Sequence, residues 1–161
     1  MRACGAWVAA LMLAGLGLTA PANAVAVGDD GCTPGYWKNH PENWQEVKPG
    51  DLLKFDHNST AFPPFMPTDA DLDGSGTDDT FLAALSFKGG SGLVGAEQIL
   101  FRAAVAAWLN AAYDDADGFG YPLRRKDFVP EVNAAIASGD RQTMLDLAAE
   151  LDALNNLGCP L

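Results

Sequence analysis

Apolar residues recur at helical spacing through the C-terminal half of the chain, most clearly in residues 93–113. The strongest apolar face of this segment has members three and four residues apart: Phe101, Val105, Trp108, Leu109 and Ala112. Alanines and aliphatic residues occupy most of its other faces, and a helix that is apolar nearly all round is usually central and buried. We therefore predict a long central helix over residues 93–113.

Two shorter segments carry the start and stop signals of helices. Residues 79–87 predict a short helix with Asp79 or Thr80 as its N-cap. Residues 127–139 predict another, with Asp127 as its N-cap and Pro130 in the first turn, where proline is tolerated.

A last helix is predicted over residues 140–158, with Asp140 as its N-cap. Its apolar stripe is formed by Met144, Leu147, Leu151 and Leu154, and we expect Asp146 and Glu150 on the opposite face. Residues 47–79, in contrast, carry proline, glycine and aspartate at short intervals and predict a long loop. No segment shows sustained strand alternation, so we predict a small all-α domain with long N-terminal loops.

The first residues have the pattern of a secretory signal peptide. Arg2 precedes an uncharged apolar stretch, and Ala22 and Ala24 provide the small residues of a cleavage site. We therefore expect residues 1–24 to be a signal peptide and residues 25–161 to be one exported domain, located outside the cell, at its surface or in the periplasm. Polar residues interrupt the apolar run of residues 93–113, so we expect no membrane span after cleavage.

The charge balance limits the partners of the exported chain. Without Arg2 it carries 9 basic and 21 acidic residues, a net charge of −12. A surface this acidic repels nucleic acid and anionic lipid. We expect no nucleic-acid partner; the charge is compatible with cations, with basic partners or with simple solubility.

Two cysteines remain after cleavage, and they lie close to the two ends of the exported chain. Cys32 and Cys159 predict a disulfide that ties the termini together, as is usual in an oxidising compartment. The alternative is a metal site formed by both cysteines with His40 and His57. The chain lacks the C-x-x-C and H-x-x-x-H spacings of common zinc sites, which favours the disulfide.

The stretch GCTPGYWKNHPENW, residues 31–44, is rich in aromatic residues and has two interpretations. Tyr36, Trp37, His40 and Trp44 form either part of the core or an exposed platform on which a sugar ring stacks. We expect tight turns at Gly35 and Pro41, with a one-turn helix beginning at Pro41.

The strings CTPGYWKNHP and LNNLGCPL, with the helix RAAVAAWLNAAY between them, resemble a group of bacterial exported proteins of unassigned function. The resemblance covers residues 32–44, 81–113 and 144–161. It implies an exported, often surface-associated module with its terminal cysteines kept as a pair. Those proteins carry a longer spacer between Thr33 and Gly35, where this chain has Pro34 alone, and no catalytic role follows from the likeness.

Residues 69–80, DADLDGSGTDDT, match the first half of a calcium-binding loop. Asp69, Asp71 and Asp73 occupy loop positions 1, 3 and 5, Gly74 permits the sharp turn at position 6, and Ser75 offers its backbone carbonyl. Position 12 is Thr80 rather than the bidentate glutamate, so Asp78 or Asp79 must complete the ligand set. We predict that this loop binds calcium; the alternative is a solvated acidic linker.

The chain contains no nucleophile-elbow, P-loop or dinucleotide motif. The preferred interpretation is a secreted or cell-surface module without enzymatic activity, which acts by binding or structure and is stabilised by calcium. The first alternative is a carbohydrate-binding domain that uses Trp37 and Trp44, and the partner in either case is a carbohydrate or another surface protein. The second is a hydrolase of unknown type, for which Asp56, His57 and Ser59 are the nearest candidates.

Overall fold

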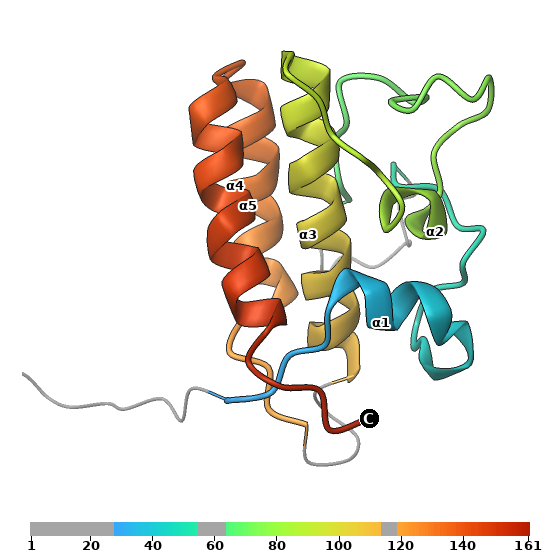
Figure 1. Cartoon of the computed structure of the whole chain (residues 1–161), viewed down its shortest axis with the longest axis vertical. Helices are drawn as coiled ribbons and strands as arrows, with labels where there is room; N and C mark the ends of the chain where they lie inside the picture. Colours follow the sequence, from blue (N-terminus) through green and yellow to red (C-terminus); the bar gives the residue numbers. More distant parts are fainter. Residues whose placement is uncertain (1–27, 55–63, 114–118) are drawn as a thin grey trace, which may run out of the picture.

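The computed structural model describes residues 28–54, 64–113 and 119–161, and within them the named elements are all helices (Figure 1). Their bounds in chain order are α1 Pro34–Asn39, the 3-10 turn η1 Pro41–Asn43, α2 Phe81–Ala84, α3 Leu93–Tyr113, α4 Arg125–Ala137 and α5 Arg141–Asn155. The all-α prediction is confirmed. Residues 1–27 and 56–59, which include the expected signal peptide and the Asp56, His57 and Ser59 candidates, lie outside the described part.

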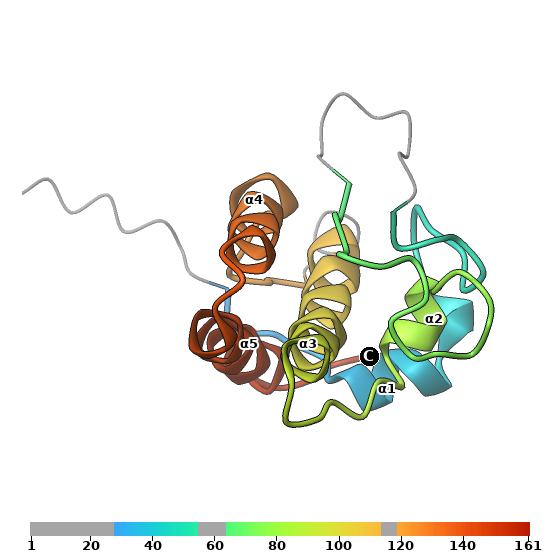
Figure 2. The ribbon, with the colours of Figure 1, turned by 90° about the horizontal axis from the view of Figure 1, so that it is seen from above.

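Helix α3 is the centre of the molecule, as its sequence predicts. Figures 1 and 2 show α4 and α5 on one side of it, and α1 and α2 on the other. Residues from Leu100 to Leu109 are buried except for Arg102, which is partly exposed. The apolar surface of α3 therefore stabilises both halves of the fold, because each half removes a different face of it from water.

The start of two helices agrees with the expected capping residues. The Asp140 side chain accepts a hydrogen bond from the Thr143 amide at 2.7 Å, and the Thr80 hydroxyl accepts one from the Ala83 amide at 3.1 Å. Each bond satisfies one backbone donor that a helix N-terminus leaves without an intrahelical partner.

The expected tight turn at Gly35 is wrong, because Gly35 lies inside α1. Thr33 caps this helix by accepting a hydrogen bond from the Tyr36 amide at 3.1 Å, and Pro34 occupies the first helical position. A threonine followed by proline is a helix start. The one-turn helix expected at Pro41 is present as η1.

The expected start of α4 at Asp127 is also wrong. The helix begins at Arg125, so Asp127 lies in its first turn, and Pro130 lies further inside the helix. The buried Arg125 side chain accounts for the earlier start: its guanidinium lies 4.7 Å from the centre of the Trp108 ring and pairs with Glu46 at 2.5 Å. These contacts hold residue 125 against α3.

The disulfide between Cys32 and Cys159 is present, and it joins positions 127 residues apart. The metal site proposed as the alternative is wrong, because both thiols are consumed in this bond. A backbone hydrogen bond from Gly31 N to Gly158 O at 2.7 Å runs beside it. The two ends of the described chain are thus held together by covalent and polar contacts.

Buried amide side chains hold these ends against α3. Asn110 of α3 binds both backbone groups of Cys32, at 2.9 Å each, and accepts a hydrogen bond from Trp37 Nε1 at 3.0 Å. It also donates to Asn155 of α5 at 2.9 Å, and the Tyr121 hydroxyl donates to the same Asn155 oxygen at 2.9 Å. We call Asn110, Asn155 and the groups that they bind the amide cluster.

No helix within the described residues is both long enough and apolar enough to cross a membrane.

Candidate metal site

The segment that carries the predicted calcium loop is attached to the helical core by side chains of α3 and α4. Asn133 of α4 accepts from the Met66 amide at 2.9 Å. The buried Glu97 of α3 accepts from the amide and the hydroxyl of Thr68, at 2.7 and 2.5 Å. Gln98 donates to the Leu72 carbonyl at 2.7 Å. These bonds place residues 69–80, the acidic loop, over the N-terminal half of α3.

Backbone amides of the acidic loop donate hydrogen bonds to the loop's own Asp71 carboxylate. Gly74 has a φ of 71°, the left-handed conformation that glycine adopts without strain, as its position in the predicted turn requires. Asp71 accepts hydrogen bonds from the amides of Ser75 at 2.8 Å and Gly76 at 2.9 Å. The Gly76 amide, with a smaller contribution from Ser75, lowers the pKa of the Asp71 carboxyl. Asp71 is therefore held ionised.

Asp79 is the unusual residue of the loop, because only 4% of its surface is exposed. Its Oδ2 accepts from the Leu72 amide at 2.5 Å, whereas its Oδ1 is buried with no hydrogen-bond partner. Burial raises the pKa of the Asp79 carboxyl; the Leu72 amide opposes this shift, and the negative charges of Asp73, Asp71 and Asp69 reinforce it. A carboxylate in this environment is unfavourable without a compensating positive charge.

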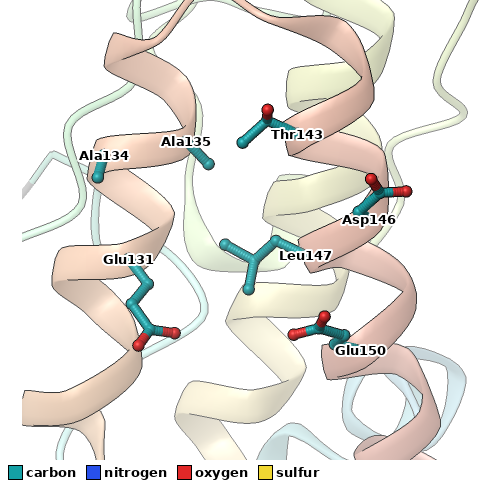
Figure 3. Close-up of a pocket in the computed structure, with 7 residues that line it drawn as sticks. All are labelled: Glu131, Ala134, Ala135, Thr143, Asp146, Leu147 and Glu150. Atoms are coloured by element: carbon teal, nitrogen blue, oxygen red, sulfur yellow. The ribbon is translucent and has the colours of Figure 1, made fainter.

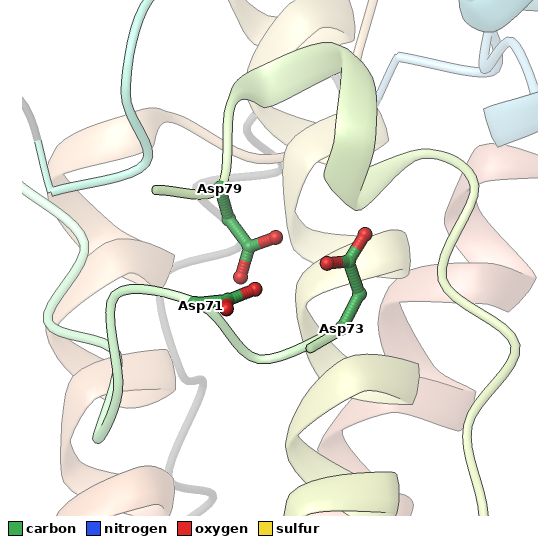
Figure 4. A group of neighbouring side chains, drawn as sticks. All are labelled: Asp71, Asp73 and Asp79. Carbon is green, nitrogen blue, oxygen red and sulfur yellow. The ribbon is translucent and has the colours of Figure 1, made fainter. Parts of the chain in front are cut away.

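The carboxylates of Asp71, Asp73 and Asp79 come together in space. One oxygen of each lies within 4.8 Å of the other two, and Figure 4 shows the three side chains turned toward one another. We call this group the carboxylate triad. Oxygen ligands alone favour a hard cation, and a flexible loop with several carboxylates suits calcium better than magnesium, which requires a near-ideal octahedron. The triad can hold such an ion, and its member Asp79 has one oxygen, Oδ1, without a protein partner.

The other residues of the predicted ligand set lie outside the triad. Asp69 is exposed and accepts a hydrogen bond from the Asp71 amide at 3.2 Å. Asp78 pairs with Lys54 at 2.8 Å instead of turning into the loop. Ser75 is exposed, and its hydroxyl contacts Thr77 at 3.1 Å. Thr80, at the position of the missing glutamate, serves as the N-cap of α2.

The aromatic residues of the GYWKNHP stretch divide between core and surface. Trp37 is fully buried, so it cannot stack on a ligand, and a platform that combines Trp37 with Trp44 is wrong. Trp44 is partly buried and donates from Nε1 to the Trp37 carbonyl at 2.9 Å. Tyr36 and His40 are partly exposed and stack on each other at 4.4 Å between ring centroids. The stretch therefore serves mainly to pack α1 against α3.

The described residues give little support to the hydrolase alternative. His40 Nδ1 lies 3.0 Å from Glu42, but the His40 side chain is partly exposed and the Glu42 side chain is exposed. Neither the groove between α4 and α5 nor the smaller one between α3 and α5 includes this pair. A catalytic acid or base needs a site that positions a substrate, and neither of these two grooves provides one at His40.

Comparisons of the chain with protein-family models, with curated proteins and with solved structures find no match.

Sequence reasoning missed three residues that position these sites. Glu97, Gln98 and Asn110 seemed only to interrupt an apolar helix. In the structure Glu97 and Gln98 hold the segment of the acidic loop, and Asn110 is the centre of the amide cluster. The sequence did contain a signal for these contacts: polar residues lie within an otherwise apolar helix. A buried polar side chain needs a hydrogen-bond partner, which another segment of the chain can provide.

Proposed function

We propose that this protein is an exported module without enzymatic activity, whose fold is completed by a calcium ion bound at the carboxylate triad. The observation that carries the proposal is the buried, unpartnered Oδ1 of Asp79 beside the carboxylates of Asp71 and Asp73. A bound cation supplies both the missing partner and the missing positive charge. Asp79 thereby takes over the role of the glutamate that the loop lacks.

The backbone around Asp79 explains how an ion there stabilises more than the loop. The Asp79 amide donates to Ala70 O at 2.6 Å, and its carbonyl accepts from Leu53 N at 3.0 Å. Asp79 also directly precedes Thr80, the N-cap of α2. An ion bound to this side chain therefore restrains the acidic loop, the segment around Leu53 and the start of α2 together.

Two features support the exported location. Residues 1–24 have the signal-peptide pattern, and disulfides such as Cys32–Cys159 form and persist in oxidising compartments. Millimolar calcium is common in such environments, which suits a site of modest affinity. We expect a dissociation constant of roughly 0.1–1 mM, because the ligand set has no bidentate glutamate.

Calorimetric unfolding with and without calcium tests the proposal. At a calcium concentration tenfold above the dissociation constant, linkage predicts about 1.4 kcal/mol of stabilisation. For a domain of this size, that corresponds to a rise in melting temperature of about 5 °C. Magnesium at the same concentration should produce a smaller rise.

Two variants separate coordination from general charge screening. Asp71→Ala removes a carboxylate of the triad and should abolish the calcium-dependent increment. Asp152→Ala removes the same charge from the exposed surface of α5 and should leave the increment unchanged. Equal increments in the protein and both variants, or no increment in any of them, would overturn calcium binding at the triad.

A further inference from the structure

A groove of about 460 Å³ runs between α4 and α5, on the face of this helix pair that points away from α3 (Figure 3). Ala135 and Leu147 form its apolar floor, and the exposed Ala134 lies at the edge of that floor. Met144 and Leu151 of the predicted α5 stripe are buried as expected, but Leu147 is only partly buried and points into the space between the two helices. The small alanines leave this apolar surface open to an incoming side chain.

The rim of the groove is acidic. Glu131 of α4 and Glu150 of α5 face each other across it near Leu147, and Asp146 adds a third carboxylate at its edge (Figure 3). The expectation that Asp146 and Glu150 lie opposite Leu147 is therefore wrong. None of the residues lining the groove is basic. Within the described part of the chain, Glu131 and Glu150 take part in no ion pair.

This arrangement is complementary to one chemical type of partner. An apolar floor flanked by carboxylates fits the aliphatic stem and the charged head of lysine or arginine, which prefer contact with both surfaces at once. A second copy of this chain is a poor occupant, because the exported chain would bring the same acidic rim and a net charge of −12 against the groove.

We propose that the α4–α5 groove is a docking site for a basic amphipathic helix of a partner protein. Apolar side chains of that helix pack over Leu147 and the alanines, and flanking lysine or arginine residues pair with Glu131 and Glu150. The proposal is independent of the carboxylate triad, because α3 separates the groove from the acidic loop (Figure 2).

Titration with a designed peptide tests the groove directly. The probe is a lysine- and leucine-containing amphipathic helical peptide, and its control is the same peptide with glutamate in place of lysine. The buffer contains millimolar calcium. Calcium bound at the acidic loop offsets the negative charge of that loop, so the loop attracts the basic peptide less. Backbone NMR shifts should change in residues 131–150 with the basic peptide only, and affinity should fall as salt is raised.

Paired variants then separate the groove from long-range attraction. Glu131→Gln combined with Glu150→Gln should weaken binding by about fivefold, in the range expected for two exposed ion pairs. Asp29→Asn combined with Asp152→Asn removes the same charge elsewhere and should change affinity by about twofold at most. Ala134→Lys places a positive charge at the edge of the groove and should weaken binding by about tenfold or more. Its control is Ala149→Lys, on another face of α5.

Two binding results would overturn the proposal: an equal loss of peptide affinity in the two paired variants, or equal affinity for the acidic and the basic peptide. Two structural results would also overturn it: NMR shift changes confined to residues 69–80, or dimerisation of the protein through the groove. Each of these results can be told apart from a failure of calcium binding. Loss of calcium binding would change the acidic loop and would leave the NMR shifts of residues 131–150 unchanged.

Discussion

The amide cluster and the acidic loop both place buried polar groups against α3, but they differ in how these groups are partnered. Asn110 makes four hydrogen bonds, two as acceptor and two as donor, which satisfies its amide completely. In the acidic loop, Asp79 has one partnered and one unpartnered oxygen, beside two further carboxylates. The first site is complete with protein atoms alone, whereas the second leaves one buried carboxylate oxygen, Asp79 Oδ1, without a protein partner.

The difference follows from charge. Amides carry both donors and acceptors, so two of them can satisfy each other and the backbone within one chain. Ionised carboxylates are acceptors only, and bringing three together adds repulsion that hydrogen bonds from Ser75 and Gly76 relieve only in part. The buried neutral network therefore has a structural role, whereas the carboxylate oxygen without a protein partner is the basis of the proposed calcium site.

The largest expected effect comes from opening the disulfide beside the amide cluster. Cys159→Ser releases a closed loop of 127 residues, and chain entropy sets an upper value of ~5 kcal/mol for the lost stability. Denaturant unfolding of the variant, compared with the oxidised protein, measures the loss. Two free thiols in protein purified from an oxidising compartment would contradict the pairing itself.

The next effect tests the completeness of the amide cluster. Asn110→Ala leaves the Trp37 Nε1–H, both backbone groups of Cys32 and the Asn155 oxygen without a partner from α3. We expect a loss of about 3 kcal/mol, because several buried polar groups become unsatisfied at once. Tyr121→Phe is the graded control: it removes one donor to Asn155 and should reduce stability by about 1 kcal/mol. Equal losses in the two variants would show that Asn110 is not the centre of the network.

The smallest effect has the opposite sign and tests the acidic loop. Asp79→Asn keeps the shape of the side chain, retains an acceptor for the Leu72 amide and removes the buried charge. Without calcium, the variant should be more stable than the natural sequence by about 1 kcal/mol. It should also lose the calcium-dependent increment. A variant that is less stable without calcium would mean that Asp79 is adequately satisfied by protein and solvent.

The pH dependence gives a second readout for Asp79. Its pKa is raised in the folded state, so its protonated form stabilises the protein below the ordinary aspartate pKa of about 3.9. That stabilisation is lost as pH rises through the higher pKa of the folded state. The stability advantage of Asp79→Asn without calcium should therefore grow between pH 4 and neutrality. A constant difference across this range would exclude a raised pKa.

Part of the candidate site could be predicted from the sequence. Aspartates at alternate positions followed by glycine identified Asp71, Asp73 and the turn at Gly74, because that pattern is local. It did not separate Asp78 from Asp79, although they are neighbours. Asp78 is attracted by Lys54, 24 positions earlier, and Asp79 is buried against Leu72. Which carboxylate enters the loop depends on contacts that spacing does not encode.

The sequence by itself determined the helical class, the central helix, the cap at Asp140 and the pairing of Cys32 with Cys159, and it reduced the cap of α2 to Asp79 or Thr80. Periodicity and capping act over a few residues, and two cysteines allow one intramolecular pair. Only the tertiary structure decided that Trp37 is core, that Asn110 joins the ends of the chain and that Leu147 faces a groove. Burial is set by partners far away in the chain: Cys32 and Asn110, which share two hydrogen bonds, are 78 positions apart.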